Sequence, residues 1–228
     1  MKALLITLVV LLGLLAVADR VGEGIAEDQV ARQIAERGQL AGEPAVDITG
    51  WPFLTQALAG EYSDVRIALT AEQLGQPAGT TADVSLQGVQ VPLSDVLGGS
   101  VAEIPVDRVE GTAALSWALL SEQLGGDTTL TREGDGVRVD RTVEVFGQEV
   151  PLTAAGQVTL DGQDLVVTVE EASGAGVDLP DVVVDRASDL LDFRYSVPAL
   201  PFGLQVTDLQ VTDRGVDVDV EATDTVLR

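Results

Sequence analysis

The stretch GWPFLTQALAGEYSDVRI, residues 50–67, places an apolar corner directly before an alternating segment. The corner carries four large apolar side chains around Pro52: Trp51, Phe53, Leu54 and Leu58. Proline is excluded from helix interiors, whereas the alternation of Val65, Ile67 and Leu69 with polar residues is typical of a strand with one buried side. We therefore expect a bend that leads into a half-buried strand.

The apolar corner has two interpretations, which do not exclude each other. It can be a core plug that closes one end of a sheet, or the lip of a cavity for an apolar ligand, because such cavities are lined mostly by apolar side chains. A second Pro-Phe corner, PALPFGLQV at residues 198–206, also stands beside a strand and contributes Phe202 and Leu204. We expect both corners to lie at an end of the sheet.

Alternation with a period of two recurs from Val46 to the C-terminus, and the sequences EGDG (133–136), LDGQD (160–164) and TDRG (212–215) are typical hairpin turns. A change of parity at Gly88 indicates a bulge. Helical segments are few: SWALLSEQLGG after a candidate N-cap Ser116, DRASDLLDFRY (185–195) and residues 28–37. The predicted fold is α+β and mostly β, with a strongly curved antiparallel sheet wrapped around a long N-terminal helix and one or two shorter helices.

Arg141 stands in the strand GVRVDRTVEVFG on the same parity as four valines: Val137, Val139, Val143 and Val145. A regular strand would turn this charge toward the apolar side, where an unpaired charge is costly. Either a bulge or an edge position lets the side chain reach water, or the guanidinium meets the phosphate of a lipid head group.

The composition excludes several function classes. Acidic residues number 37 against 13 basic ones, for a net charge of −24, so the chain repels nucleic acids and does not adsorb broadly to anionic lipid. The absence of His and Cys removes Ser-His-Asp and Cys-His catalysis and thiolate or imidazole metal sites. Asp217, Asp219 and Glu221 alternate with valines as a solvated strand face does. We expect no catalytic residue, no metal site and no cofactor.

The N-terminus opens with Lys2 and then runs from Ala3 to Ala18 without a charge. The small residues Ala16 and Ala18 before Asp19 match a cleaved secretory signal. Apolar residues at helical spacing further on suit a retained anchor instead, so both alternatives stay open. In either case we expect an exported protein on the outer face of the plasma membrane, with residues 1–18 as signal or anchor. Residues 19–228 then form a single domain, consisting of an amphipathic helix (19–40) and a curved sheet body (45–224).

Four segments together resemble the LmeA-type phospholipid-binding proteins of actinobacterial cell envelopes: DRVGEGIAEDQVARQI, VDITGWPFLTQALAGEYSDVRIAL, GTAALSWALLSEQL and ALPFGLQVTDLQVTDRGVDVDVEATD. The resemblance spans residues 19 to about 224, and G-x-P-F-L-T-Q is its most specific part. It implies a non-enzymatic protein that binds phospholipid in an elongated apolar cavity of a tubular lipid-binding fold. It also implies a role in envelope lipid or lipoglycan biogenesis.

The residues and the resemblance together lead to a phospholipid-binding protein as the first hypothesis. Its mouth would contain Trp51, Phe53, Leu54, Leu58, Phe202 and Leu204, with Arg141 as the head-group partner. A second hypothesis is a structural or adaptor protein with a self-filled core, which acts on a partner through its acidic surface. A carboxylate-based hydrolase would require converging acids, and no spacing in the sequence demands them.

Overall fold

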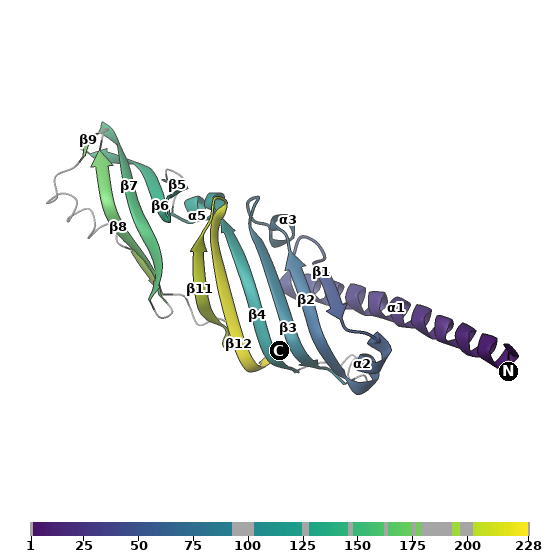
Figure 1. The fold of residues 1–228 in the computed structure, drawn as a ribbon. Helices are drawn as coiled ribbons and strands as arrows, with labels where there is room; N and C mark the ends of the chain where they lie inside the picture. The colour runs from purple at the N-terminus through teal and green to yellow at the C-terminus, as the bar shows by residue number, and fades with distance from the viewer. Residues whose placement is uncertain are drawn as a thin grey trace. The chain divides into compact units, whose positions relative to one another are not determined.

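The structure is a computed structural model that describes residues 2–92, 103–124, 128–145, 148–161, 164–174, 177–178, 193–196 and 203–227. It is an α+β protein with a long N-terminal helix and antiparallel sheets (Figure 1). The predicted fold class is confirmed. The strands form two six-stranded sheets, with the orders β1-β2-β3-β4-β12-β11 and β10-β8-β7-β6-β5, the short β9 pairing with β8.

The described helices are α1 (Lys2–Gly38), α2 (Phe53–Ala59), α3 (Ala71–Leu74) and α5 (Trp117–Leu124). The strands of the first sheet are β1 (Ala45–Thr49), β2 (Glu61–Leu69), β3 (Thr81–Gln90), β4 (Ile104–Ser116), β11 (Gln205–Val211) and β12 (Gly215–Leu227). Those of the second are β5 (Thr128–Glu133), β6 (Gly136–Val145), β7 (Gln148–Asp161), β8 (Asp164–Gly174), β9 (Val177–Asp178) and β10 (Phe193–Ser196).

The chain divides into two compact units. The first contains residues 1–69, 83–111 and 222–228, and the second contains residues 70–82 and 112–221. The first unit holds α1, α2 and the apolar corner, so it positions most of the residues that the sequence singles out.

Helix α1 joins the uncharged N-terminal run and the predicted amphipathic helix into one element. It is long and apolar enough to cross a membrane. Every residue from Lys2 to Ala18 is exposed, whereas Asp19 and Ala31 are buried against the rest of the first unit. Gly22 and Gly24 do not interrupt the helix, although glycine weakens helices intrinsically. The second part of α1 therefore packs on the first unit, and the first part extends beyond it.

The register of β1 and β2 aligns their apolar residues. Val46 faces Ile67 and Ile48 faces Val65 across the antiparallel pair. Opposite residues of such a pair share one side of the sheet. Ile48 and Val65 are buried, as the alternation in the sequence predicts.

Gly88 has the backbone conformation typical of a bulge, at the position where the change of parity predicts one. Its φ is +64°, a conformation that glycine adopts without strain. A Cβ on Gly88 would also lie 2.9 Å from the Cβ of Asp107 and closer still to its carboxylate. Leu86 and Val89, three residues apart, are both buried as a result. The bulge thus keeps the apolar side of β3 in register with the core.

The hairpins of the second unit also follow the sequence. Glu133 pairs with Gly136, and Asp161 pairs with Asp164. At the third turn the backbone N–H of Thr212 donates to the carbonyl of Gly215 at 2.8 Å. All three predicted turn sequences therefore join adjacent antiparallel strands.

The helix at SWALLSEQL is confirmed as α5, and the Ser116 hydroxyl accepts from the backbone N–H of Leu119 at 3.2 Å, as an N-cap does. For the candidate helix DRASDLLDFRY, residues 185–192 lie outside the described residues. Its end, Phe193–Ser196, is strand β10. The aromatic and β-favouring residues Phe193 and Tyr195 suit this pairing with β8.

Candidate functional site

The apolar corner folds as a short helix between two strands. Pro52 precedes α2 and Phe53 begins it, so the proline stays out of the helix interior, where it would break the helix. The Trp51–Pro52 peptide bond is cis. The helix ends at Gly60, whose φ is +73° and whose N–H donates to the carbonyl of Gln56 at 2.8 Å. The bend that the sequence predicts is thus formed by the short helix α2.

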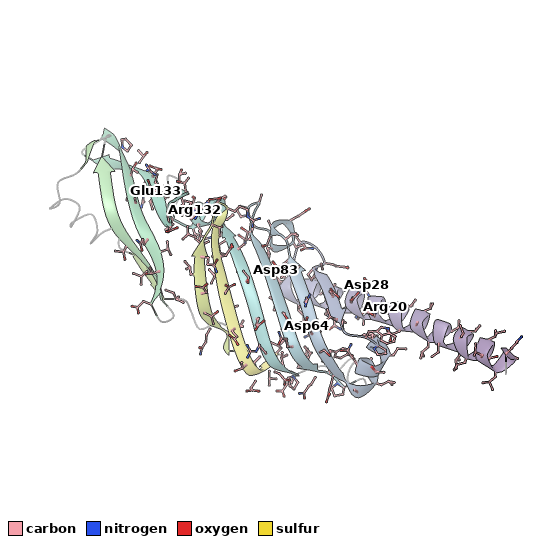
Figure 2. The ribbon with its side chains drawn as sticks, viewed as in Figure 1. Arg20, Asp28, Asp64, Asp83, Arg132 and Glu133 are labelled. Carbon is pink, nitrogen blue, oxygen red and sulfur yellow. The ribbon has the colours of Figure 1, made fainter. Side chains whose placement is uncertain are left out.

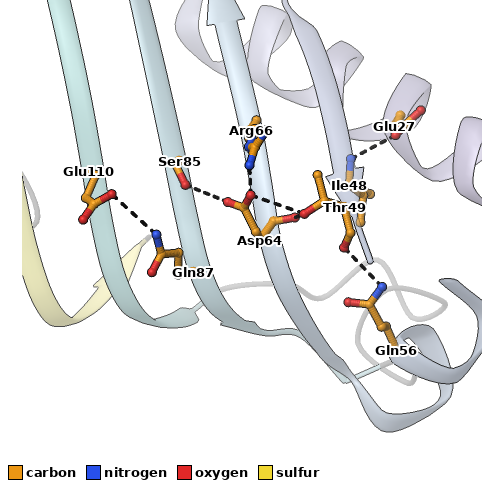
Figure 3. Close-up of polar contacts among 9 residues, drawn as sticks. All are labelled: Glu27, Ile48, Thr49, Gln56, Asp64, Arg66, Ser85, Gln87 and Glu110. Atoms are coloured by element: carbon orange, nitrogen blue, oxygen red, sulfur yellow. Dashed lines mark hydrogen bonds and ion pairs between the residues drawn. The ribbon is translucent and has the colours of Figure 1, made fainter. Parts of the chain in front are cut away.

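Gln56 ties the two ends of this corner together. Its amide nitrogen donates to the carbonyl of Thr49 at 3.3 Å (Figure 3). Its amide oxygen accepts from the backbone N–H of Ser63 at 2.9 Å. Thr49 ends β1 and Ser63 lies near the start of β2. One side chain therefore satisfies backbone groups on both strands that flank α2.

Asp19 of α1 caps α2 from outside. Pro52 makes no side-chain capping bond, and the first backbone N–H groups of a helix need acceptors. The Asp19 carboxylate, which is 2% exposed, accepts from the Leu54 N–H at 2.7 Å. Its charge also suits a helix N-terminus. The corner is consequently fixed to α1 at the first charged residue after the apolar run.

A second carboxylate attaches α1 to the sheet. Glu27 accepts from the backbone N–H of Ile48 at 2.9 Å (Figure 3). Between these anchors, Gly22 lies against the corner, because a Cβ there would meet Phe53 at 3.6 Å and Leu54 at 3.7 Å. Ala31 is buried one further turn along. Small and acidic residues of α1 thus dock on the first unit, whereas the large apolar residues from Leu4 to Val17, together with Val21 and Ile25, stay exposed.

The strands of the first unit carry an aliphatic face. Its buried members are Ile48, Val65, Leu86, Val89, Val106 and Val109. Its half-buried members are Val46, Ile67, Leu69, Val84 and Ile104. No aromatic or charged residue interrupts either set. Because the second set keeps contact with solvent, part of the aliphatic face is uncovered.

The opposite face of the same strands is polar. Asp64 accepts from Ser85 at 2.6 Å and from Arg66 at 2.8 Å, and Gln87 lies 3.5 Å from Glu110 (Figure 3). These contacts place Ser85 and Gln87 with Asp64, so the residues between them in sequence point to the aliphatic face. The sheet of the first unit is therefore amphipathic.

Further charged side chains lie on α1 and along the strands. Figure 2 shows Arg20 and Asp28 on α1 and Asp64 and Asp83 on the strands. Arg20 pairs with Glu23 at 2.7 Å. In the second unit, Asp208 faces Asp219 across β11 and β12. The hydrogen bond from Gln210 holds the pKa of the Asp208 carboxyl below its usual range.

The structure separates the predicted site residues by exposure. Within the corner, Trp51 and Leu58 are 70% and 76% exposed, whereas Phe53 is 5% exposed and Leu54 is half-buried. Phe53 stands with its ring centroid 6.2 Å from that of Tyr62, and burial raises the pKa of the Tyr62 hydroxyl. Phe53 is therefore the plug of the corner, and Trp51 and Leu58 are its outer surface.

The other predicted residues belong to the second unit, apart from Phe202, which lies outside the described residues. Leu204 is half-buried. Arg141 is exposed, opposite Thr128 of β5 and Leu152 of β7. Its guanidinium makes no ion pair with the described residues. The structure thus brings four predicted residues together at the corner, and the exposed position of Arg141 agrees with a side chain that reaches water.

The sequence did not identify Asp19, Glu27 or Gln56 as the residues that build the site. Asp19 and Leu54 are 35 positions apart, and no local sequence pattern indicates that a carboxylate caps a distant helix. The capping box of α3, in which Thr70 and Gln73 bond reciprocally, does have a sequence signal that could have found it. Among the described residues, no group of three or more acidic side chains is arranged to hold a metal ion.

Of the comparisons with known proteins, the one with protein families gave a match. The searches found no significant match among curated proteins or among solved structures. The family model described as LmeA-like phospholipid-binding matches residues 17–221, which is most of the chain. This match contains α2, the aliphatic face and both carboxylates that attach α1. An amphipathic sheet with a partly uncovered aliphatic face suits contact with acyl chains, and the chain belongs to the LmeA-like phospholipid-binding family.

Proposed function

We propose that the protein binds phospholipid in the cell envelope without catalysing a reaction, and that acyl chains lie along the aliphatic face. The proposal rests on the half-buried residues of this face, which remain partly in contact with solvent. Val46 and Ile67 form one half-buried cross-strand pair, and Leu69 and Val84 stay half-buried as well. Methylene groups placed on these side chains would leave water together with them.

The energy of binding would come from the acyl chains. Burying one CH₂ is worth about 0.8 kcal/mol, so ten methylenes in contact with the face gain about 8 kcal/mol relative to water. A net charge of −24 gives an anionic head group no general attraction. Arg141, in the second unit, is our proposed partner for a phosphate group, because its exposed guanidinium is a bidentate phosphate donor.

The corner would serve this site in two ways. Phe53 closes the core, and Trp51, Leu54 and Leu58 form the lip past which the ligand enters. Phe202 and Leu204 would form the equivalent lip of the second Pro-Phe corner. Replacing Leu54 by Asp tests this assignment: a Leu54→Asp protein that folds and keeps full lipid loading argues against a mouth at this position.

We further propose that the body, residues 19–228, acts outside the cytoplasm as a single domain and transfers or presents phospholipid for envelope lipid or lipoglycan biogenesis. The apolar helix α1 supports an exported protein, since it suits either a signal sequence or an anchor. A lipid carrier is also physically reasonable, because an acyl chain exchanges one apolar environment for another when it leaves a bilayer for the aliphatic face.

Vesicle uptake tests the proposal. Delipidated full-length protein is incubated with phosphatidylinositol or phosphatidylethanolamine vesicles, separated from them, and assayed for bound lipid by organic extraction. We expect about one phospholipid per chain. The absence of bound lipid with both vesicle types would contradict phospholipid binding.

The acidic side of β11 and β12 favours the adaptor as a second candidate function. Asp208 lies opposite Asp219 across the two strands, Asp217 is on the same side of β12, and the hydroxyl of Thr112 donates to Asp219 at 2.6 Å. Such a surface suits a basic protein partner. Replacing Asp208 and Asp217 by Asn would lower the affinity for such a partner but leave the amount of bound phospholipid per chain unchanged.

A further inference from the structure

Among the described residues outside α1, the two most exposed large apolar side chains both belong to the corner. Beyond α1, the described residues contain four exposed large hydrophobics: Trp51, Leu58, Leu124 and Val226. Trp51 and Leu58 are 70% and 76% exposed, against 44% and 39% for the other two. Isolated exposed leucines are ordinary, but a Trp two residues before the seven-residue helix α2 and a Leu near its end place two exposed side chains on one short segment, which forms an apolar projection.

This projection is fixed beside the point where α1 turns from apolar to polar. Asp19, which caps α2 through Leu54, follows directly on the uncharged run that ends at Ala18. Gly22, one turn further along, is in van der Waals range of Phe53. Figure 1 shows the N-terminal part of α1 continuing past α2 and β1. The corner is therefore located at the level of the first turn after the apolar run.

We propose that Trp51 and Leu58, which we name the foot, insert into the lipid interface of the bilayer that holds residues 3–18. A helix of sixteen residues is about 24 Å long, somewhat shorter than a hydrocarbon core of about 30 Å. The residues of α1 directly after Ala18 would thus lie at the depth of the membrane–water interface. Tryptophan prefers this region because its ring is apolar and its N–H is polar.

The electrostatics of the corner agree with an apolar contact. The only Lys of the sequence is Lys2, at the far end of α1. Arg20, the cation nearest the corner along α1, is paired with Glu23. A net charge of −24 gives the protein no general attraction to anionic lipid, so we expect a bilayer contact to rely on apolar side chains. Val21 and Ile25, both exposed, continue the apolar surface of α1 beyond Ala18.

The foot goes beyond the proposed phospholipid site. It concerns how the first unit is held against a bilayer, and it requires no lipid on the aliphatic face. The rigid attachment through Asp19 means that α1 and the foot enter the membrane as one body. The aliphatic face would then be presented at a fixed height above the lipid.

Tryptophan quenching tests the proposal, because the chain contains just Trp51 and Trp117. Full-length Trp117→Phe protein, which keeps Trp51, and Trp51→Phe protein, which keeps Trp117, are reconstituted into phospholipid nanodiscs. The lipid carries bromine either near the carbonyl or near the chain end. We expect shallow bromine to reduce Trp51 emission at least twofold more than Trp117 emission, and deep bromine to act less. Equal quenching of both tryptophans, or stronger quenching by deep bromine, would overturn the foot.

Two leucine substitutions supply the matched comparison in the protein that keeps Trp51. Leu58→Asp places a charge on the foot and is expected to reduce quenching of Trp51, while Leu124→Asp alters an exposed leucine elsewhere and leaves quenching unchanged. Quenching is expected to be the same at 0.05 and 0.5 M salt, since the contact is apolar. A loss of quenching at high salt, or an equal effect of the two substitutions, would contradict the proposal.

Lipid loading of the same detergent-purified proteins separates this inference from the proposed function. Quenched Trp51 with no bound phospholipid supports the foot and contradicts phospholipid binding. Bound phospholipid with unquenched Trp51 contradicts the foot and leaves phospholipid binding intact. Circular dichroism establishes that each variant is folded before its quenching and lipid loading are interpreted.

Discussion

The carboxylate of Asp19 accepts the backbone N–H of Leu54 at 2.7 Å, and this bond joins the N-terminal helix to the apolar corner. It is made across 35 positions of sequence between a residue that is 2% exposed and the first turn of a seven-residue helix. Such a short helix has little stability of its own. The corner therefore depends on α1 for its position.

Removing this cap should loosen the corner. Asp19→Ala leaves the Leu54 N–H without an acceptor, and a hydrogen bond to a charged group is worth about 1.5–3 kcal/mol. We expect the unfolding free energy to fall by about that amount and the Leu54 amide to exchange faster with solvent. Asp28→Ala, which changes an exposed carboxylate of the same helix, is the control. Equal amide protection in the two variants would show that Asp19 does not hold α2.

The Gly88 bulge should be intolerant of a side chain for two separable reasons. Gly88 and Gly75 both have φ of +64°, but a Cβ meets Asp107 at Gly88 and open space at Gly75. Alanine at either site carries a conformational cost of about 1–2 kcal/mol. We expect Gly88→Ala to cost a further 1–3 kcal/mol or so from overpacking. Denaturation curves of the two variants measure the difference, and equal midpoints would refute the close approach.

Tyr62 should make the protein less stable in alkali. Burial raises the pKa of its hydroxyl above 10.0, so the folded state retains the proton that the unfolded state loses. This contribution is complete below pH 10.0 and is lost as pH rises toward the folded pKa. Between pH 9 and 11, the unfolding free energy of the wild type should therefore fall more steeply than that of Tyr62→Phe. Parallel slopes would show that Tyr62 ionises equally well in both states.

Lipid loading should depend on one side of β2 and not on the other. Ile67→Asn puts a polar amide on the half-buried part of the aliphatic face, and we expect bound phospholipid per chain to drop severalfold. Arg66→Asn changes the neighbouring residue on the polar face, which is exposed, and should leave loading unchanged. Extraction and lipid quantification of both folded variants would check this. An unaffected Ile67→Asn protein would place the acyl chains elsewhere.

Much of this fold follows from local sequence patterns. Alternating valines predicted the strands, Ser116 predicted the start of α5, and three turn sequences predicted three hairpins, because each of these features is decided by neighbouring residues. Pro52 was misleading in one respect. It suggested a bend without a helix, whereas it precedes α2 and leaves the helix interior intact.

The sequence could not predict which aromatic residue of the corner is buried and which is exposed. Trp51 and Phe53 are both aromatic and flank the same proline, yet one is exposed and the other is buried. The difference arises because Phe53 lies against Gly22 of α1, a contact between residues far apart in sequence. The division of the chain into two compact units likewise depends on strand pairing at long range. The single-domain organisation of residues 19–228 stays a prediction.

Native mass spectrometry of the full-length protein purified from its own cell envelope, with lipid identification after organic extraction, tests phospholipid binding most directly. The account predicts a mass increased by one phospholipid per chain and the same lipid in the extract. A clean unliganded mass, together with no uptake from added phospholipid vesicles, would contradict it and favour an adaptor that acts through its acidic surface.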